Sequence, residues 1–469
     1  MRQGGTERPG KSKKDTLFMI LHDILRDRAF NWRLISLTLP ISLQSLMLAL
    51  VAAADALMLG RVDQISMAAV SLATQIQFVQ NMLLWAIVSG IAVLGAQYWG
   101  KGDRAVMGRI YAISARQAAV VCLVFFLGCR FFPSRLMLLF AHDPELVRIG
   151  AEYLEIASWS YLLTGLSQCA LGIMKVSDHV ACAAVISSGA VILNIILNAV
   201  FIFGLAGFPA MGVKGAALAT VAARAAELIW CTGISLRRGF IRLTLRDLRT
   251  FDRLLELDFL RYMLPILGAG LLWGTGFTAY TAIMGHLGPD AAAANSVAAV
   301  VRDLMCCLCN GFSGAAGIII GNKLGAGRLI QGKKYGDRLV VFSILLGLFC
   351  TVCVLACIPV VSRCLLLTDQ ARTYMEGMFI ILSVYMIGRT ICTIVINGIF
   401  SAGGDTLFDI YSLIVCMWGI ALPCAFASAF FFHFPVLVAY ACTCLDEVGK
   451  VPWVLAHHRR YKWVRNITR

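Results

Sequence analysis

The sequence predicts an all-α integral membrane protein with twelve transmembrane helices in two pseudo-symmetric six-helix lobes. Of its 469 residues, 59% are hydrophobic and only 14% are charged, whereas soluble domains contain roughly 45 to 50% apolar residues. Apolar runs of about 20 residues, enough to cross a bilayer, recur along the chain. No charged stretch is long enough for a globular domain of about 100 residues, so we expect the function to lie inside the membrane.

Hydropathy predicts six spans on either side of a basic connection. The N-terminal lobe is expected at residues 33–236, after a basic N-terminus at 1–32, and the C-terminal lobe at 262–456, before a basic tail at 457–469. The connection 237–261 mixes arginines with apolar side chains, which is typical of an amphipathic segment at the membrane interface. The predicted spans lie near 33–60, 66–98, 107–130, 148–174, 179–206, 212–236, 262–286, 291–321, 337–360, 376–400, 408–432 and 434–456.

The two lobes repeat one another at a constant offset of 225 residues, which pairs Pro40 with Pro265 and Gly100 with Gly325. Each half has an even number of spans, so both halves enter the membrane from the same side. Their symmetry axis then runs along the membrane normal, as in secondary transporters with parallel repeats. Rocking of two such lobes can open a cavity between them to either side in turn.

The positive charge indicates the topology. The formal net charge is +15, and the Lys and Arg residues cluster in alternate loops, on the side of the N-terminus. The excess of positive charge near cytoplasmic anionic lipid places both termini in the cytoplasm and the chain in the plasma membrane. Membrane lipids are therefore the expected partners of these basic loops, and nucleic acid is not a partner.

Three polar residues inside the spans are candidates for binding a cation. Asp55 lies two-thirds of the way through the first span, where burying a carboxylate costs about 2.5 to 3.5 kcal/mol on insertion scales. It should therefore face a polar cavity, unless it lies near the interface beside a neighbouring dipole. Asn194 and Asn198 are four residues apart and share one helix face, so both offer amide oxygens to one point.

Neutral amides also occur inside apolar spans, at Gln44, Gln75 and Gln168. Such side chains can line a cavity for amphipathic cations or form hydrogen bonds between helices. The residues alone leave both alternatives open. We take the three glutamines as candidates for the substrate cavity.

Several motifs together resemble the multidrug and toxic compound extrusion (MATE) family over about residues 33–456. In the first half they are Leu39-Pro40, Asp55, Leu59-Gly60, Ala68 to Ser71 and the run GAQYWGKGD at 95–103. In the second half they are Pro265, Gly285 and the run GNKLGAGR at 321–328. The runs GVKGAALAT at 212–220 and AGGDT at 402–406 also match.

The resemblance implies roles for residues of the N-terminal lobe. Asp55 matches the first-helix aspartate that serves the family as a proton or sodium site. Thr220 matches a sixth-helix hydroxyl near that site, although the same hydroxyl could simply bond back to its own helix. Asn198 stands where some members carry a second aspartate, so the chain lacks one carboxylate for sodium.

In the C-terminal lobe the sequence departs from the family pattern. Gly270 and Trp273 occupy seventh-helix positions where a Glu is common, and Ser401 replaces an Arg that often precedes Gly-Gly-Asp. We therefore expect ion coupling through the N-terminal lobe, and we expect Asp405 to order a helix end.

Other classes of function fit the sequence less well. The run 95–101 has the spacing of a phosphate-binding loop, but Gly102 replaces the required Ser or Thr. The 17 cysteines lie singly or in apolar runs without histidines beside them, so no metal site is expected apart from transported Na⁺ at Asp55. No convergent catalytic set or extramembrane ligand domain indicates an enzyme or a receptor.

The sequence thus predicts a secondary active antiporter. It would export an organic, cationic and amphipathic small molecule in exchange for inward H⁺ or Na⁺, by alternating access between the lobes. The coupling cation is expected at Asp55, Asn194, Asn198 and Thr220, with no cofactor and with the monomer as the working unit. A flippase for lipid-linked saccharides or cell-wall precursors, which shares the general plan, is the alternative.

Overall fold

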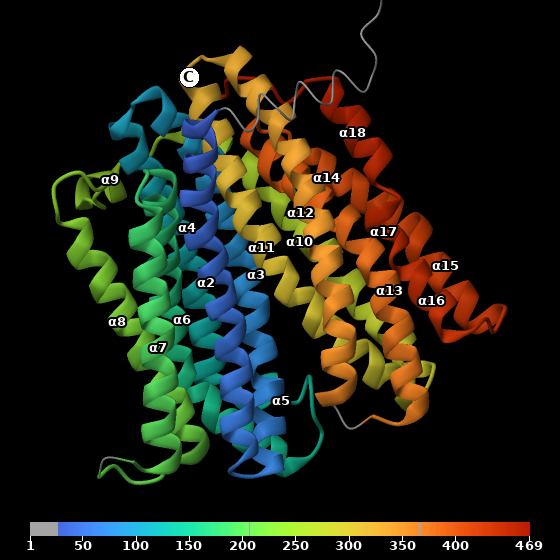
Figure 1. The fold of residues 1–469 in the computed structure, drawn as a ribbon. Coiled ribbons are helices and arrows are strands. Elements are labelled where there is room, and N and C mark those ends of the chain that lie inside the picture. The colour runs from blue at the N-terminus through green and yellow to red at the C-terminus, as the bar shows by residue number, and fades with distance from the viewer. Residues whose placement is uncertain (1–26, 206, 365–366) are drawn as a thin grey trace, which may run out of the picture.

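The computed structural model describes residues 27–205, 207–364 and 367–469, and all regular elements within them are helices (Figure 1). The N-terminal lobe contains α2 to α8. These are α2 (Arg28–Gly60), α3 (Gln64–Lys101), α4 (Arg104–Phe131), the short α5 (Pro133–Met137), α6 (Pro144–Val176), α7 (Val180–Phe203) and α8 (Gly212–Ser235). A short helix, α9 (Leu245–Arg249), lies in the connection between the lobes.

The C-terminal lobe begins with three long helices and ends with segmented ones. The long helices are α10 (Arg253–His286), α11 (Pro289–Gly325) and α12 (Leu329–Cys364). They are followed by α13 (Asp369–Cys392) with the π-helical η1 (Thr393–Phe400), then α14 (Leu407–Ser412), η2 (Leu413–Ala421), α15 (Leu422–Phe426) and η3 (Ala427–Phe431), and last α16 (Val436–Thr443), α17 (Leu445–Val448) and α18 (Val451–Arg459).

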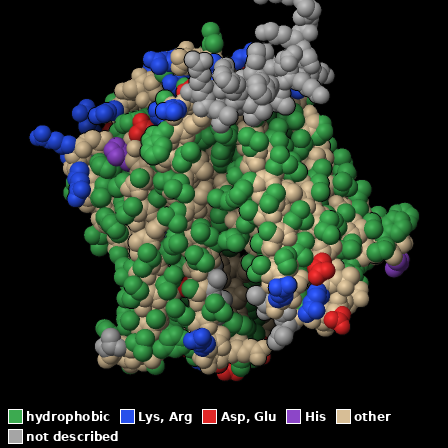
Figure 2. Space-filling view, in the orientation of Figure 1, with side chains coloured by type: hydrophobic (Ala, Val, Ile, Leu, Met, Phe, Trp, Pro, Cys, Tyr) green, Lys and Arg blue, Asp and Glu red, His purple; other side chains and the backbone are tan. Residues whose placement is uncertain are grey.

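The all-helical, twelve-helix fold is confirmed. Ten helical stretches among the described residues are long and apolar enough to cross a membrane, from α2 to the α14–η3 stretch. The two remaining predicted spans correspond to α6 and to the succession α16–α18. Hydrophobic side chains cover the middle of the bundle in Figure 2, where lipid would contact it.

Several of the long helices begin at an aspartate that caps them. Asp63, Asp103 and Asp252 accept hydrogen bonds from the free backbone N–H groups that open α3, α4 and α10. Most helices extend several residues beyond the predicted spans, because hydropathy marks the apolar core whereas the caps mark the helix end. For the same reason α10 begins at Arg253, inside the predicted connection 237–261.

The lobes meet at the end of the bundle that carries Asp27 and the C-terminus, here named the terminal end (Figure 1). α2 packs along α11, and α3 packs against α10 and α11. A Cβ on Gly100 would overlap with the backbone of Asn322, and a Cβ on Gly325 with the backbone of Gln97. The glycines that repeat at an offset of 225 residues therefore allow the two lobes to approach closely at this end.

The last residues of the chain cross this contact between the lobes. Trp463 is fully buried, and Arg465 donates hydrogen bonds to the carbonyl oxygens of Gly403 (2.7 Å) and Gly404 (2.6 Å) in the C-terminal lobe. The backbone N–H of Ile467 donates to Oε1 of Gln97 on α3 (2.9 Å). The tail thus joins both lobes at the terminal end.

At the opposite end, here named the far end, the lobes separate. Figure 2 shows a hollow between them that opens at this end, while Lys and Arg gather mainly at the terminal end. The structure is therefore closed at the terminal end and open at the far end.

Candidate functional site

Four polar side chains from three helices form a hydrogen-bonded chain inside the N-terminal lobe. Asn198 Nδ2 on α7 donates to Asp55 Oδ1 on α2 at 2.6 Å and lies 3.1 Å from Oδ1 of Asn194. Asn194 Nδ2 in turn lies 3.5 Å from the hydroxyl oxygen of Thr220 on α8. All four residues that the sequence predicts for ion coupling therefore lie together.

The local sequence places these side chains on facing helices. Asn194 and Asn198 are one helical turn apart, so both project toward α2 and α8. Thr220 uses its hydroxyl in both ways considered from the sequence, since it donates to the carbonyl of Ala216 at 3.0 Å and accepts from Asn194.

The chain of polar groups has free acceptor capacity. Asn198 is 1% exposed, and its Oδ1 is buried without a hydrogen-bond partner. A buried unsatisfied oxygen is costly unless something binds it. Together with the carboxylate of Asp55, this oxygen could coordinate a cation.

Other polar groups surround the cluster. Arg224 on α8 is close enough to act electrostatically on Asp55, and its guanidinium pairs with the fully buried Glu227 at 2.8 Å. The hydroxyl of Ser167 donates to the same Glu227 carboxylate at 3.1 Å. Arg224 therefore acts on both Glu227 and Asp55.

The three glutamines do not gather at this cluster. Gln44 on α2 is 4% exposed, and its Oε1 has no hydrogen-bond partner. Gln75 on α3 is exposed, and Gln168 on α6 is half-buried. They lie on three different helices, and their assignment to a substrate cavity stays a prediction.

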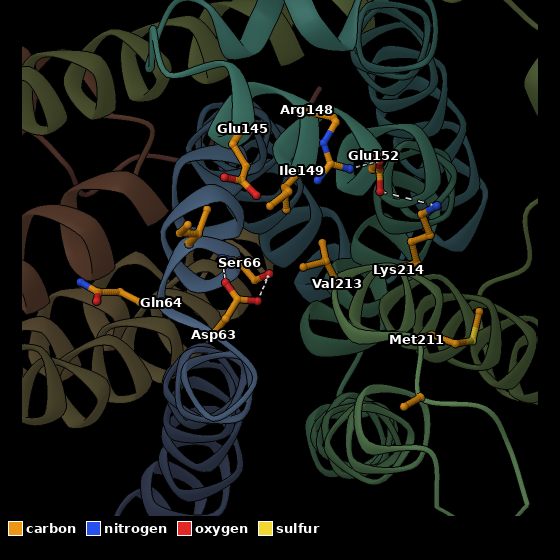
Figure 3. Close-up of a pocket in the computed structure, with 12 residues that line it drawn as sticks. Asp63, Gln64, Ser66, Glu145, Arg148, Ile149, Glu152, Met211, Val213 and Lys214 are labelled. Atoms are coloured by element: carbon orange, nitrogen blue, oxygen red, sulfur yellow. Dashed lines mark hydrogen bonds and ion pairs between the residues drawn. The ribbon is translucent and has the colours of Figure 1, made fainter.

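A large pocket of about 930 Å³ opens at the far end of the N-terminal lobe (Figure 3). In its lining, Glu152 on α6 binds Arg148 of the same helix (2.8 Å) and Lys214 of α8 (3.5 Å). On its other side, hydrogen bonds from the hydroxyl and backbone N–H of Ser66 hold the pKa of Asp63 below its ordinary value. Asp55 lies five residues before the end of α2, roughly 7 Å along the helix from this mouth.

The C-terminal lobe contains a buried charge cluster that the sequence reading missed. Glu447 on α17 pairs with Arg389 on α13 at 2.6 Å and with Lys450 at 3.5 Å. Asp446 is fully buried beside them, and its Oδ2 has no hydrogen-bond partner. Two adjacent acids inside the predicted span 434–456 were the signal that could have revealed this cluster.

No cofactor site is apparent among the described residues. No group of three or more His, Cys, Asp or Glu side chains is placed to hold a metal ion in that part of the chain. The oxygens of Asp55, Asn194 and Asn198 are the set that fits a cation. Since they include only one carboxylate, they suit a cation that binds and leaves rather than a resident metal.

Two helical lobes, closed at one end and open at the other around a buried acid, define the class of polytopic membrane transporters with parallel repeats. Comparison with known proteins identifies the family. The MatE family model matches residues 40–200 and again 265–427, more than half of the chain. The protein belongs to the MatE family, the multidrug and toxic compound extrusion transporters.

Relatives and solved structures agree with this assignment. The chain is 24% identical over 460 residues to an uncharacterized transporter, YisQ, of Bacillus subtilis, covering 94% of this chain and 96% of the relative. It is 26% identical over 422 residues to a probable multidrug resistance protein NorM of Pasteurella multocida, covering 85% and 86%.

Among solved structures, the chain resembles the outward-facing conformation of a multidrug resistance MATE transporter, with a TM-score of 0.84, 16% identity and coverage of 94% and 97%. It also resembles the bent form of the Vibrio cholerae MATE transporter VcmN, with a TM-score of 0.81, 16% identity and coverage of 92% and 97%. These likenesses confirm the twelve-helix fold.

Proposed function

We propose that the protein is a secondary antiporter that exports organic, cationic and amphipathic compounds in exchange for inward H⁺ or Na⁺. The observation that supports this most directly is the hydrogen bond between Asp55 and Asn198 inside the N-terminal lobe. An ionisable residue at membrane depth is costly and usually serves a function. The names of the NorM relatives, which describe multidrug resistance, support an organic substrate.

In this proposal the protein lies in the plasma membrane with its terminal end toward the cytoplasm. The positive charge at that end favours this orientation. The structure then corresponds to the state that is open to the outside. A cation entering from the far end would neutralise Asp55, with the amide oxygens of Asn194 and Asn198 as further ligands. The monomer contains both lobes and is sufficient for this cycle.

Neutralisation of Asp55 would change the balance between the two states of the transporter. A ligand shifts such a balance only by the difference in its affinity for the states. A cationic substrate and the coupling cation both bind better when Asp55 is negatively charged, so they compete for its charge. Binding of the coupling cation from outside would therefore favour release of the substrate. The site would then return to the cytoplasmic side without substrate.

The experiment that tests this function is efflux of the cationic dye ethidium from proteoliposomes, under a pH gradient and separately under a sodium gradient. Asp55→Asn keeps the size of the side chain and removes its charge. We expect efflux against a concentration gradient with one of the two ions, and loss of that efflux in Asp55→Asn.

The matched control is Asp369→Asn, because Asp369 is an exposed aspartate at the start of α13 in the other lobe. It should transport as the unaltered protein does. Uphill efflux that persists in Asp55→Asn would refute the role of Asp55. Absence of efflux under both gradients, with verified orientation, would favour the flippase alternative over drug export.

A further inference from the structure

The two lobes carry opposite chemistry at equivalent positions. The repeat holds its offset of 225 residues from Pro40 and Pro265 to Gly60 and Gly285. Within this register, the position in α10 that corresponds to Asp55 is occupied by Tyr280. An acceptor of hydrogen bonds in one lobe is therefore replaced by a hydrogen-bond donor in the other.

The same replacement extends to the next helix. α3 and α11 also keep the offset, through Gly100 and Gly325. Gln77 on α3 thereby corresponds to Arg302 on α11. The C-terminal lobe gains a permanent positive charge at a position where the N-terminal lobe has a neutral amide.

Tyr280 and Arg302 line one small cavity of about 50 Å³ between α10, α11, α13 and α16. Two of these four helices, α10 and α11, pack against α3 of the N-terminal lobe. None of its lining residues, all of them in the described part of the chain, is acidic. The lining residues are Phe277, Tyr280, Thr281, Met284, Asn295, Ala299, Arg302, Leu382, Tyr385, Tyr440, Thr443 and Cys444.

Two of the lining hydroxyls are buried and unused. Tyr280 is 6% exposed and Tyr385 is 4% exposed, and the hydroxyl oxygen of each has no hydrogen-bond partner. Buried hydroxyls are normally satisfied, so an unpaired pair in one cavity indicates a missing acceptor. The cavity is too small for a whole drug-sized molecule, but it admits one small group of a larger molecule.

The guanidinium of Arg302 adds charge to these donors. It lies over the ring of Phe277, with Cζ 4.6 Å from the ring centre. It contacts Asp303 through Nε and Nη2, both 3.0 Å from the same carboxylate oxygen. Because the side chain of Asp303 is 66% exposed, this pair is screened and leaves Arg302 able to bind a second anionic group.

Further charged groups lie beyond the lining of the cavity. Asp446 and Glu447 are close enough to act on Tyr280 and on Tyr385. The buried cluster also includes Asp409, which acts on Lys450, so three acids face the two cations Arg389 and Lys450. Among the residues that line the cavity itself, Arg302 is the one cationic side chain, and it supplies the positive charge nearest to a bound group.

We propose that this cavity binds the carboxylate of an organic substrate. Arg302 would hold the planar carboxylate, and the hydroxyls of Tyr280 and Tyr385 would donate hydrogen bonds to its oxygens. Phe277, whose ring lies under the guanidinium, would hold Arg302 in place for this contact. The inference rests on the proposed function, because the substrate between the lobes is what brings the carboxylate to the cavity.

The consequence concerns the class of substrate. A molecule that places a cationic group toward Asp55 and a carboxylate toward Arg302 is a zwitterion, and it would bind more tightly than the corresponding ester. The probes are rhodamine B, whose carboxylate is free, and rhodamine B ethyl ester, which keeps the same cationic ring system. Binding is measured by fluorescence anisotropy with the full-length protein in lipid nanodiscs.

We expect rhodamine B to bind about tenfold more tightly than its ester, as one charge-assisted contact allows. Arg302→Gln should abolish this difference while leaving the affinity for the ester unchanged. Arg363→Gln is the matched control, because Arg363 is exposed at the end of α12, and it should keep the difference. The double variant Tyr280→Phe, Tyr385→Phe should reduce the difference in affinity between acid and ester. This variant provides a second test if Arg302→Gln does not fold.

Three results would overturn the proposal: equal affinity of the unaltered protein for acid and ester, no binding of either dye, or a preference for the acid that survives in Arg302→Gln and in the tyrosine variant. Failure of the antiport function is recognised separately. It would appear as absent gradient-driven efflux of ethidium, whereas the ratio of acid to ester binding needs no gradient.

Discussion

Asn198 on α7 donates a hydrogen bond of 2.6 Å to the carboxylate of Asp55 on α2. A neutral amide can hold a carboxylate in place without supplying the opposite charge that would fix it as an ion pair. The carboxylate then stays free to exchange cations, and the amide oxygen of Asn198, which has no hydrogen-bond partner, stays free to join them. This arrangement distinguishes Asp55 from the ion-paired Glu447 of the C-terminal lobe.

A second carboxylate at the position of Asn198 should increase the affinity for sodium. Asn198→Asp adds a negative charge beside Asp55, and the affinity of oxygen sites for hard cations rises with the number of carboxylates. We expect the Kd for Na⁺, measured through the Na⁺-dependent change in tryptophan fluorescence, to fall about tenfold. Gln370→Glu, which adds the same charge at an exposed position of α13, should leave the Kd unchanged. An unchanged Kd in Asn198→Asp would show that Asn198 is not part of the ion site.

The glycines of the repeat differ in what they permit. A Cβ at Gly100 would overlap with the backbone of Asn322 in the other lobe, whereas Gly285 has no atom within 4 Å of an added Cβ. Gly100→Ala should therefore prevent full closure of the terminal end and reduce gradient-driven dye efflux about tenfold or more. Gly285→Ala is the matched control and should transport normally, since alanine is well tolerated within a helix. Normal efflux in Gly100→Ala would show that the close contact is dispensable.

The sequence was sufficient to predict the helices and the repeat. Apolar runs and the paired positions Pro40 and Pro265 carry the information for twelve spans in two lobes. The cluster around Asp55 could also be predicted, because a carboxylate inside a span is costly and two amides one turn apart must share a helix face.

Other contacts could not be read from the sequence. The tail 457–469 was predicted only as a basic segment, yet Arg465 binds backbone carbonyls of Gly403 and Gly404. Any residue offers a carbonyl oxygen, so no pattern of side chains marks such a partner. The unused hydroxyl of Tyr280 was hidden for a similar reason, because a tyrosine in an apolar helix resembles an ordinary core residue.

The tail should stabilise the closed terminal end. Gln97 on α3 binds it twice, donating to the carbonyl of Arg465 at 3.3 Å and accepting from the backbone N–H of Ile467 at 2.9 Å. Deletion of residues 465–469 removes both contacts. Spin labels at Ala105 and Ile330, exposed positions of the two lobes at this end, should then show a larger population of long distances by pulsed electron paramagnetic resonance.

The control for this deletion is Lys462→Ala, which alters an exposed cation of the tail and removes neither contact. Its distance distribution should match that of the unaltered protein. Identical distributions in the deletion variant would mean that the glycine contacts alone close the terminal end.

The stability of the protein should decrease in mild acid because of His458. This side chain is 4% exposed and stacks on Trp463, with ring centres 5.3 Å apart. Burial, together with the positive fields of Arg459 and His457, lowers its pKa from 6.5 to about 4. The carboxylate of Asp337, at 3.7 Å, is beyond hydrogen-bonding distance and does not offset these effects.

A lowered pKa means that the unfolded chain binds a proton at a higher pH than the native protein does. The contribution of His458 is therefore fully present above about pH 6.5 and is lost as the pH falls toward about 4, by up to about 1.4 kcal/mol per pH unit. His458→Gln should make the decline of thermal stability with falling pH shallower in this range. His142→Gln, at an exposed loop position, should leave the slope unchanged, and equal slopes for His458→Gln and the unaltered protein would exclude His458 as the cause.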